Sequence, residues 1–210
     1  MDILDIHTHQ SENASKAITS VSPSDFNPVE GNCYSVGIHP WSVAEIDGNE
    51  WIDELIRVAS HPQVVAIGEI GLDKLITTDM TLQTKIVEIQ VAVAEQLRLP
   101  VVIHCVRAFN ELIQLKKKIK PTTPWIIHGF RAKKSIVEQL IKQGFYISFG
   151  EKYQQDALCL VPLNKLFLET DESENNIEIL YQQIADARSI PYYQLLTQIQ
   201  QNSKDVFFNH

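Results

Sequence analysis

Cysteine is scarce in this sequence, and long apolar runs are absent from it. The three cysteines, Cys33, Cys105 and Cys159, are scattered and form no CxxC pair, which argues against a disulfide framework and a thiolate-ligated structural zinc site. We expect them to be buried free thiols in a reducing cytosol. No apolar run approaches the roughly 20 residues that a membrane span requires, and the first residues lack the basic segment and apolar core of a secretory signal. These absences predict a cytoplasmic protein without membrane contact.

Basic residues are also in deficit. The chain carries 18 lysines and arginines against 26 aspartates and glutamates, for a formal net charge of −8. This balance argues against a protein that coats nucleic acid with its whole surface, because such binding neutralises phosphates with lysine and arginine. A local site that holds phosphate through metal ions is compatible with it. No Gly/Ser linker or low-complexity tract interrupts the 210 residues, so we expect a single domain spanning 1–210.

Eight short apolar runs, rich in β-branched residues, each end at a polar or ionisable residue. Their near-continuous hydrophobicity predicts parallel strands that are covered on both faces. The predicted strands span 3–9, 17–22, 33–40, 63–73, 100–105, 124–130, 145–150 and 165–171. Between most of them, Leu, Ile and Val recur at intervals of three and four, which predicts helices. These helices span 50–61, 81–97, 109–119 and 133–144, and two more follow residue 171.

The alternation of strand and helix predicts an α/β fold, and eight strands favour a TIM-type (β/α)8 barrel over an open sheet. The first half of this barrel has few helical segments. Residues 10–16, between the first two predicted strands, are too few for a helix, although they could return the chain along one strand. We therefore expect a compact, distorted barrel whose first helix is missing. An irregular second strand is the alternative.

Ionisable side chains gather at the ends of the predicted strands. In "DIHTH" (5–9), His7 and His9 share one face of the first strand, because side chains alternate along a strand. At the ends of later strands stand His39, Glu69, His104, His128 and Asp171. Barrels of this kind build their sites where the carboxyl ends of the strands meet. We therefore predict that these side chains converge on one metal site.

The types of these side chains narrow the choice of metal. Imidazole and carboxylate without thiolate favour Zn, Mn, Co or Fe over Ca. Four of these histidines and the two carboxylates make six candidate ligands, more than one tetrahedral ion uses while leaving room for a substrate. Two divalent ions that share a carboxylate account better for the set. We expect zinc as the bound metal, with magnesium or manganese as alternatives during activity.

The motifs "DIHTH", "VGIHPW", "VVAIGEIGLD", "PVVIHCVRA", "IIHGF", "GFYISFG" and "LFLETD" follow one another over nearly the whole chain. In content and order they resemble those of the TatD-type metal-dependent hydrolases of the amidohydrolase superfamily. The resemblance implies a (β/α)8-type barrel with two divalent metal sites. By motif, it implies that one ion is held by His7, His9 and Asp171, the other by His104 and His128, and that Glu69 bridges the two.

The same resemblance implies catalytic roles. Asp171 would take the proton of a metal-activated water as general base, and Glu69 would belong to the catalytic set as the shared ligand. His39 is expected to contact the substrate, with structural support as the alternative. Glu169 and Asp73 are expected to contact the metal-binding residues and hold them in position without binding the metal themselves.

Two positions depart from the family pattern. The family usually carries an arginine two residues after the histidine that corresponds to His104. This chain has Val106 there and Arg107 one step further, and we expect Arg107 to contact the substrate. After "ETD" the chain continues as "ESENNIEIL", which is acidic where the family is basic. The departures weaken the assignment of a nuclease more than that of a hydrolase.

Activities known in the family centre on phosphodiester hydrolysis in DNA, often by metal-dependent exonucleases, and some relatives cleave the ester that links a D-amino acid to tRNA. We expect an enzyme that hydrolyses phosphodiesters, with nucleic acid or a small phosphoester as substrate, acting as a monomer or weak homo-oligomer. One alternative is a hydrolase of a small ester, amide or phosphate, or of an aminoacyl-tRNA ester, with the same two metals. Another is a binding protein whose metal site is vestigial.

Overall fold

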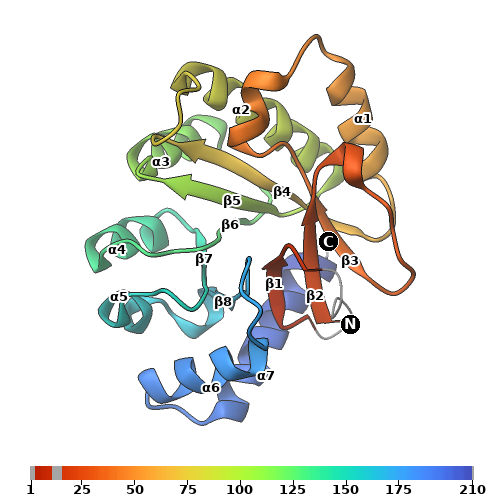
Figure 1. The fold of residues 1–210 in the computed structure, drawn as a ribbon. Coiled ribbons are helices and arrows are strands. Elements are labelled where there is room, and N and C mark those ends of the chain that lie inside the picture. The colour runs from red at the N-terminus through yellow and green to blue at the C-terminus, as the bar shows by residue number, and fades with distance from the viewer. Residues whose placement is uncertain (1–2, 11–15, 210) are drawn as a thin grey trace.

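A computed structural model describes residues 3–10 and 16–209, and its centre is a sheet of eight parallel strands (Figure 1). Each strand pairs with the next along the chain, in the order β1 to β8. The strands are β1 (Asp5–Thr8), β2 (Ala17–Val21), β3 (Cys33–Val36), β4 (Val64–Asp73), β5 (Val101–Val106), β6 (Trp125–Ile127), β7 (Tyr146–Phe149) and β8 (Leu166–Leu168). A bridge between Thr8 and Asp171 joins the two edges. The predicted (β/α)8-type barrel is confirmed, in a nearly closed form.

Helices lie around the outside of these strands (Figure 1). They are α1 (Glu50–Ala59), α2 (Met80–Leu97), α3 (Phe109–Ile119), α4 (Lys134–Lys142), α5 (Gln155–Leu160), α6 (Ile177–Ala187) and α7 (Tyr192–Ser203). Between β2 and β3 the described helical structure is one short 3-10 turn, η2 (Pro23–Asp25). The first helix is predicted to be missing from the segment between β1 and β2. Residues 11–15 of this segment lie outside the described residues, so this stays a prediction. No helix in the described ranges is long and apolar enough to span a bilayer.

The interior of the barrel and the layer under the helices form one continuous apolar core. All ten residues of β4 are buried, as expected for a strand that is covered on both faces. Of the three cysteines, Cys33 is buried and Cys105 is partly buried against the core. Cys159 is exposed, so the expectation that all three thiols are buried is wrong for it. Cys159 lies on the short helix α5, where only one face packs inward.

Two glycines of β4 let the neighbouring strand approach closely. A Cβ atom at Gly71 would lie 1.8 Å from the carbonyl oxygen of His104, and one at Gly68 would lie 2.7 Å from that of Val102. Both contacts are too short for any side chain, since real Cβ atoms need more than 3 Å. The glycines of "GEIG" therefore bring β5 against β4 and set His104 beside Glu69.

Candidate metal centre

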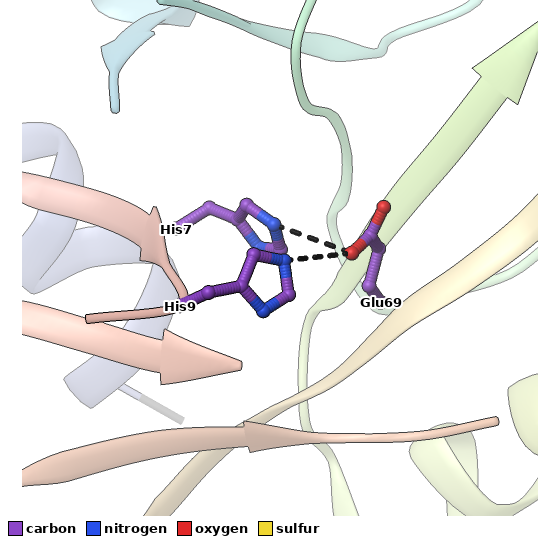
Figure 2. Close-up of side chains that lie close together, drawn as sticks. All are labelled: His7, His9 and Glu69. Carbon is purple, nitrogen blue, oxygen red and sulfur yellow. Dashed lines mark ion pairs between the residues drawn. The ribbon is translucent and has the colours of Figure 1, made fainter. Parts of the chain in front are cut away.

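Glu69 lies at the middle of the cluster that the sequence predicts. One carboxylate oxygen, Oε2, lies 3.4 Å from Nε2 of His7 and 3.4 Å from Nε2 of His9 (Figure 2). Both histidines come from the end of β1. Oδ1 of Asp171 lies 3.8 Å from each of these two ring nitrogens. The end of β1, the middle of β4 and the segment after β8 thus contribute to one half of the cluster. Glu69 therefore does not end its strand as predicted, because β4 continues to Asp73.

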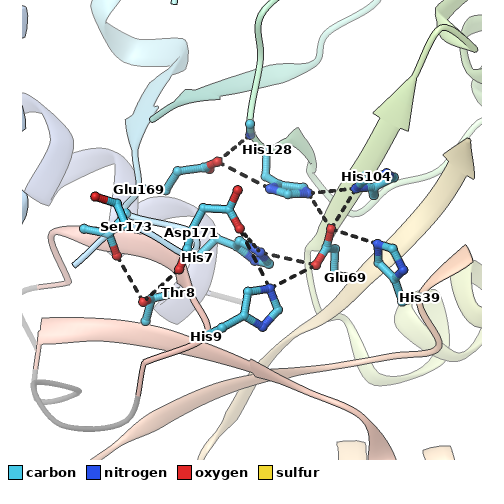
Figure 3. Close-up of polar contacts among 12 residues, drawn as sticks. His7, Thr8, His9, His39, Glu69, His104, His128, Glu169, Asp171 and Ser173 are labelled. Atoms are coloured by element: carbon cyan, nitrogen blue, oxygen red, sulfur yellow. Dashed lines mark hydrogen bonds and ion pairs between the residues drawn. The ribbon is translucent and has the colours of Figure 1, made fainter. Parts of the chain in front are cut away.

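The other oxygen of Glu69, Oε1, faces a second group of imidazoles (Figure 3). It lies 2.8 Å from Nδ1 of His104, 2.7 Å from Nε2 of His128 and 3.2 Å from Nε2 of His39. The carboxylate therefore stands between two separate sets of ring nitrogens, with one oxygen turned toward each. This is the arrangement that a carboxylate shared by two ions requires.

The donor set fits divalent metal ions. His7, Glu69 and His128 are all buried, and neither ring nitrogen of His7 has a hydrogen-bond partner in the described part of the chain. A buried imidazole without a partner loses free energy unless something satisfies it. In each of three sets of residues, the potential ligand atoms lie within 4.8 Å of one another. The sets are His7–His9–Glu69, His7–His128–Asp171 and His39–Glu69–His104.

Burial and charge shift the pKa values of the cluster strongly. Burial would raise the pKa of the Glu69 carboxyl, but the charge of His128 and hydrogen bonds from the neighbouring imidazoles outweigh it and hold this pKa far below its usual range. Burial would lower the pKa of His128, but Glu69 and Glu169 raise it well above the ordinary value. Burial and the charge of His128 lower the pKa of His7. The pKa of His128 thus moves toward the protonated ring and that of His7 toward the neutral ring, which is the form of imidazole that ligates a metal.

Two further carboxylates hold the imidazoles in place. The fully buried Glu169 lies 3.3 Å from Nδ1 of His128 and accepts a hydrogen bond from the backbone N–H of Gly129. Asp73 lies 3.5 Å from Nε2 of His104 and accepts a hydrogen bond of 3.0 Å from the indole of Trp41. Such partners fix the ring orientation of metal-binding histidines. The geometry agrees with the supporting roles expected for Glu169 and Asp73.

Asp171 occupies an unusual backbone conformation. Its φ of 57° lies in the left-handed region, which aspartate tolerates better than most residues but which still costs free energy. Its backbone is held on both sides, because its N–H donates to the carbonyl of His7 and its carbonyl accepts from the N–H of His9. This pairing with the end of β1 turns the carboxylate toward the two histidines.

The structure separates the two predicted substrate contacts. His39 belongs to the cluster itself: its ring centroid is 4.6 Å from that of His104. Arg107 does not touch Glu69; it is exposed, with a φ of 54°, just after β5. It lines a cavity beside the cluster. Strand β3 ends at Val36, so His39 lies in the following loop and not on the strand as predicted.

Two residues near the centre escaped the sequence analysis. Trp41 is the second residue of the turn that follows His39, and its side chain is among the most exposed large apolar ones, at 64%. Arg131 lies three residues after His128, and one of its guanidinium nitrogens is 3.9 Å from Oδ2 of Asp171. Each follows a predicted ligand closely, which is the one feature of the sequence that could have identified it.

Two cavities open beside the cluster. One, of about 470 Å³, is lined by His39 and Trp41 among others. The other, of about 440 Å³, is lined by Arg107 and Arg131 among others. His104, His128 and Asp171 line both, so the predicted ligands form the wall between them.

Comparisons with known proteins agree with this geometry. The sequence profile of the family described as "TatD related DNase" matches residues 28–208. An uncharacterized metal-dependent hydrolase of Bacillus subtilis, YabD, is 25% identical over 82% of this chain and 76% of its own length. The 3′-5′ ssDNA/RNA exonuclease TatD of Erwinia tasmaniensis is 33% identical over 66% of this chain, which spans 58% of that protein. The crystal structure of YJJV, a TatD homologue from Escherichia coli K12, superposes with a TM-score of 0.83 at 20% identity, covering 98% of this chain and 97% of the other.

Proposed function

The chain belongs to the family of TatD-related DNases and is a metal-dependent hydrolase of the TatD type. We propose that it removes nucleotides from the 3′ end of single-stranded nucleic acid. The observation that carries this proposal is the position of Glu69, whose two oxygens face two sets of imidazoles. Two metal ions about 3.5–4 Å apart stabilise both the attacking and the leaving oxygen of a phosphodiester. Relatives named as exonucleases for single-stranded DNA and RNA support the choice of substrate.

The proposed centre holds two divalent ions. His7, His9 and Asp171 would bind one ion and His104 and His128 the other, with Glu69 shared. Zinc suits a set of imidazoles and carboxylates as the bound metal, and magnesium or manganese could replace it during activity. Bound ions would supply Lewis acidity and lower the pKa of a coordinated water.

Residues of the chain provide the remaining chemistry. The carboxylate of Asp171 is partly exposed, at 27%, and lines both cavities. It is therefore placed to accept the proton of the attacking water as a general base. Nε2 of His39 lies at the wall of the larger cavity, where it can contact a phosphate oxygen of the substrate.

The test is a metal-dependent degradation assay. The purified protein is stripped of metal, reloaded with Zn, Mn or Mg, and given a 5′-labelled single-stranded oligonucleotide and, separately, bis(p-nitrophenyl) phosphate. We expect stepwise shortening from the 3′ end that requires metal. Asp171→Asn should reduce the rate by about 10²- to 10⁴-fold, the range of a lost general base, whereas the exposed Glu174→Gln serves as the matched control.

Other outcomes would contradict the proposal. Hydrolysis of the small phosphodiester without any loss of oligonucleotide would favour a hydrolase of small esters or phosphates that uses the same residues. Absence of turnover with every metal, despite stoichiometric binding, would favour the binding protein with a vestigial site. We further propose that 1–210 acts as one domain and as a monomer or weak homo-oligomer in the cytoplasm, which sedimentation analysis and cell fractionation would check.

A further inference from the structure

The two cavities beside the metal centre differ in charge. The larger one, here called the tryptophan cavity, contains Trp41, three serines and the acids Asp25 and Glu172. None of its described lining residues is lysine or arginine. The smaller one, the arginine cavity, contains Arg107 and Arg131 and no carboxylate other than Asp171 among its described lining residues. A substrate that spans the centre therefore meets two different environments.

The arginine cavity brings together basic residues from two neighbouring loops. Arg107 follows β5 and Arg131 follows β6, so both come from loops beside the ligands His104 and His128. Two exposed lysines, Lys133 and Lys134, continue from Arg131. The side chain of Arg131 is 58% exposed, which leaves its guanidinium free to contact a second anion. These four basic residues stand out in a chain of net charge −8. They can bind a phosphate of the substrate that lies next to the scissile one.

The tryptophan cavity offers a surface for a base. The indole of Trp41 is exposed but its orientation is fixed, because its N–H donates to Asp73 and its ring meets His39 edge-on at 5.0 Å between centroids. Bases of single strands stack on such exposed aromatic rings. Hydroxyl groups of Ser20, Ser22 and Ser42 line the same cavity and can bond to a sugar.

We propose that the strand binds with a fixed polarity: the 3′-terminal nucleoside occupies the tryptophan cavity, and the phosphate on the 5′ side of the scissile one binds Arg131 and Arg107. This inference rests on the proposed 3′ exonuclease activity. A 3′-terminal nucleotide has a free hydroxyl and no phosphate beyond the scissile one, so its cavity needs no cation. The next nucleotide upstream carries a further phosphate, and the cavity that binds this phosphate does need a cation.

The chemistry is consistent with this polarity. Water attacks the scissile phosphorus, the bond to the upstream O3′ breaks, and that oxygen takes a proton. A nucleoside 5′-monophosphate remains in the tryptophan cavity and the shortened strand keeps a new 3′ hydroxyl. When the shortened strand advances by one nucleotide, the phosphate that was bound by Arg131 and Arg107 becomes the next scissile one, and the following phosphate takes its place at the arginines.

The first experiment compares a dinucleotide, which has only the scissile phosphate, with a trinucleotide, which has one phosphate upstream. The parent protein should prefer the trinucleotide in kcat/KM. Arg131→Ala and Arg107→Ala should each reduce that preference roughly three- to tenfold, the range for one partly exposed charged hydrogen bond. Arg57→Ala is the matched control, because Arg57 pairs with Glu54 on α1 and lines neither cavity.

A second experiment tests the opposite end of the substrate. A 3′ phosphate on the trinucleotide should lower kcat/KM at least tenfold, because Asp25 and Glu172 repel it. Trp41→Ala should raise KM for both oligonucleotides, and Trp41→Phe, which also lacks the indole N–H but keeps a ring, should restore most of the loss. The nucleoside 5′-monophosphate should quench tryptophan fluorescence of the parent and much less that of Trp41→Phe.

The outcomes separate this inference from the function on which it rests. If oligonucleotides are degraded from the 3′ end but Arg131→Ala and Arg107→Ala slow the dinucleotide and trinucleotide equally, the polarity is wrong and the exonuclease stands. Faster cleavage of the 3′-phosphorylated substrate would reverse the assignment of the two cavities. If no oligonucleotide is cleaved while bis(p-nitrophenyl) phosphate is, the proposed function fails and the polarity fails with it.

Discussion

Replacing Glu69 with glutamine tests whether one carboxylate serves two ions. The substitution keeps the shape of the side chain but changes one oxygen to an amide nitrogen and removes the charge. One of the two faces would then present N–H donors to imidazoles that now lie within 3.4 Å of a carboxylate oxygen. An amide nitrogen cannot ligate a metal, so one ion loses its ligand atom. The other ion keeps only a neutral amide oxygen in place of a charged carboxylate oxygen, so both sites should be weakened.

The size of the effect follows from where Glu69 lies. Replacing a partner that only supports a ligand costs about 10- to 100-fold in metal affinity, and Glu69 contacts five imidazoles directly. We therefore expect affinity to fall by at least about 100-fold, equivalent to about 2.7 kcal/mol. The metal-free fold should change less, because the imidazoles can release their protons when the carboxylate is removed. A shift in Tm of only a few degrees is expected, since 1 kcal/mol corresponds to about 2–4 °C at this size.

Elemental analysis after reloading and dialysis gives the metal content, and bis(p-nitrophenyl) phosphate gives turnover. The parent should retain two ions and Glu69→Gln fewer than one, with turnover lost. Glu88→Gln is the control, because Glu88 forms its ion pair with the surface residue Lys118, away from the metal centre. The reasoning is refuted if Glu69→Gln keeps both ions at parental affinity, or loses them only because it unfolds.

Three further substitutions have defined outcomes. Glu169→Gln should lower metal affinity about 10- to 100-fold by releasing His128, measured by titration against a competing chelator. Gly71→Ala should destabilise the fold by more than about 3 kcal/mol in urea unfolding, because its Cβ would overlap a β5 carbonyl, whereas Gly150→Ala, with only ordinary contacts, should not. Burial would raise the pKa of Glu95, but hydrogen bonds from the loop before β6 lower it to about 2. The ionised Glu95 therefore stabilises the fold above pH 4.5, and this stabilisation is lost as the pH falls toward 2. Because solvent screens this partly exposed group, Glu95→Gln should remove only about 1 kcal/mol of the pH-dependent free energy of unfolding.

The convergence of the ligands could be predicted because parallel strands all end at one rim. His7 and His104 are far apart in sequence, yet each stands near the carboxyl end of its strand. Glu69, predicted to end its strand, lies instead in the middle of β4. Once the runs are assigned to a barrel, topology alone brings their ends together. Their roles as metal ligands stay a prediction, since convergence shows which side chains meet and not what they bind.

What escaped prediction lies in the loops. The run 33–40 was assigned to one strand, but Pro40 begins the 3-10 helix η3 (Pro40–Glu45), and Nδ1 of His39 caps it by accepting from the N–H of Trp41. Hydrophobic periodicity carries no information about such a turn, so Trp41 was counted as the end of a motif and not as part of the site. Helix α5 was missed because its six residues are too few to show a period of 3.6.

The overall acidity of the chain and a polyanionic substrate are reconciled by the kind of ligands at the centre. Imidazoles bind metal as neutral groups, so the two divalent ions proposed here would bring four positive charges against the two negative ones of their ligands Glu69 and Asp171. The further carboxylates Glu169 and Asp73 contact the opposite ring nitrogens of His128 and His104, so the excess of about two applies to the ligands themselves. A set of carboxylates would cancel that excess and weaken the attraction for phosphate. The proposed ions, together with Arg107 and Arg131, would place positive charge at the centre, while the net charge of −8 over the whole chain disfavours extended binding of nucleic acid to the surface. Such a distribution favours binding a strand by its end at one point over binding along its length.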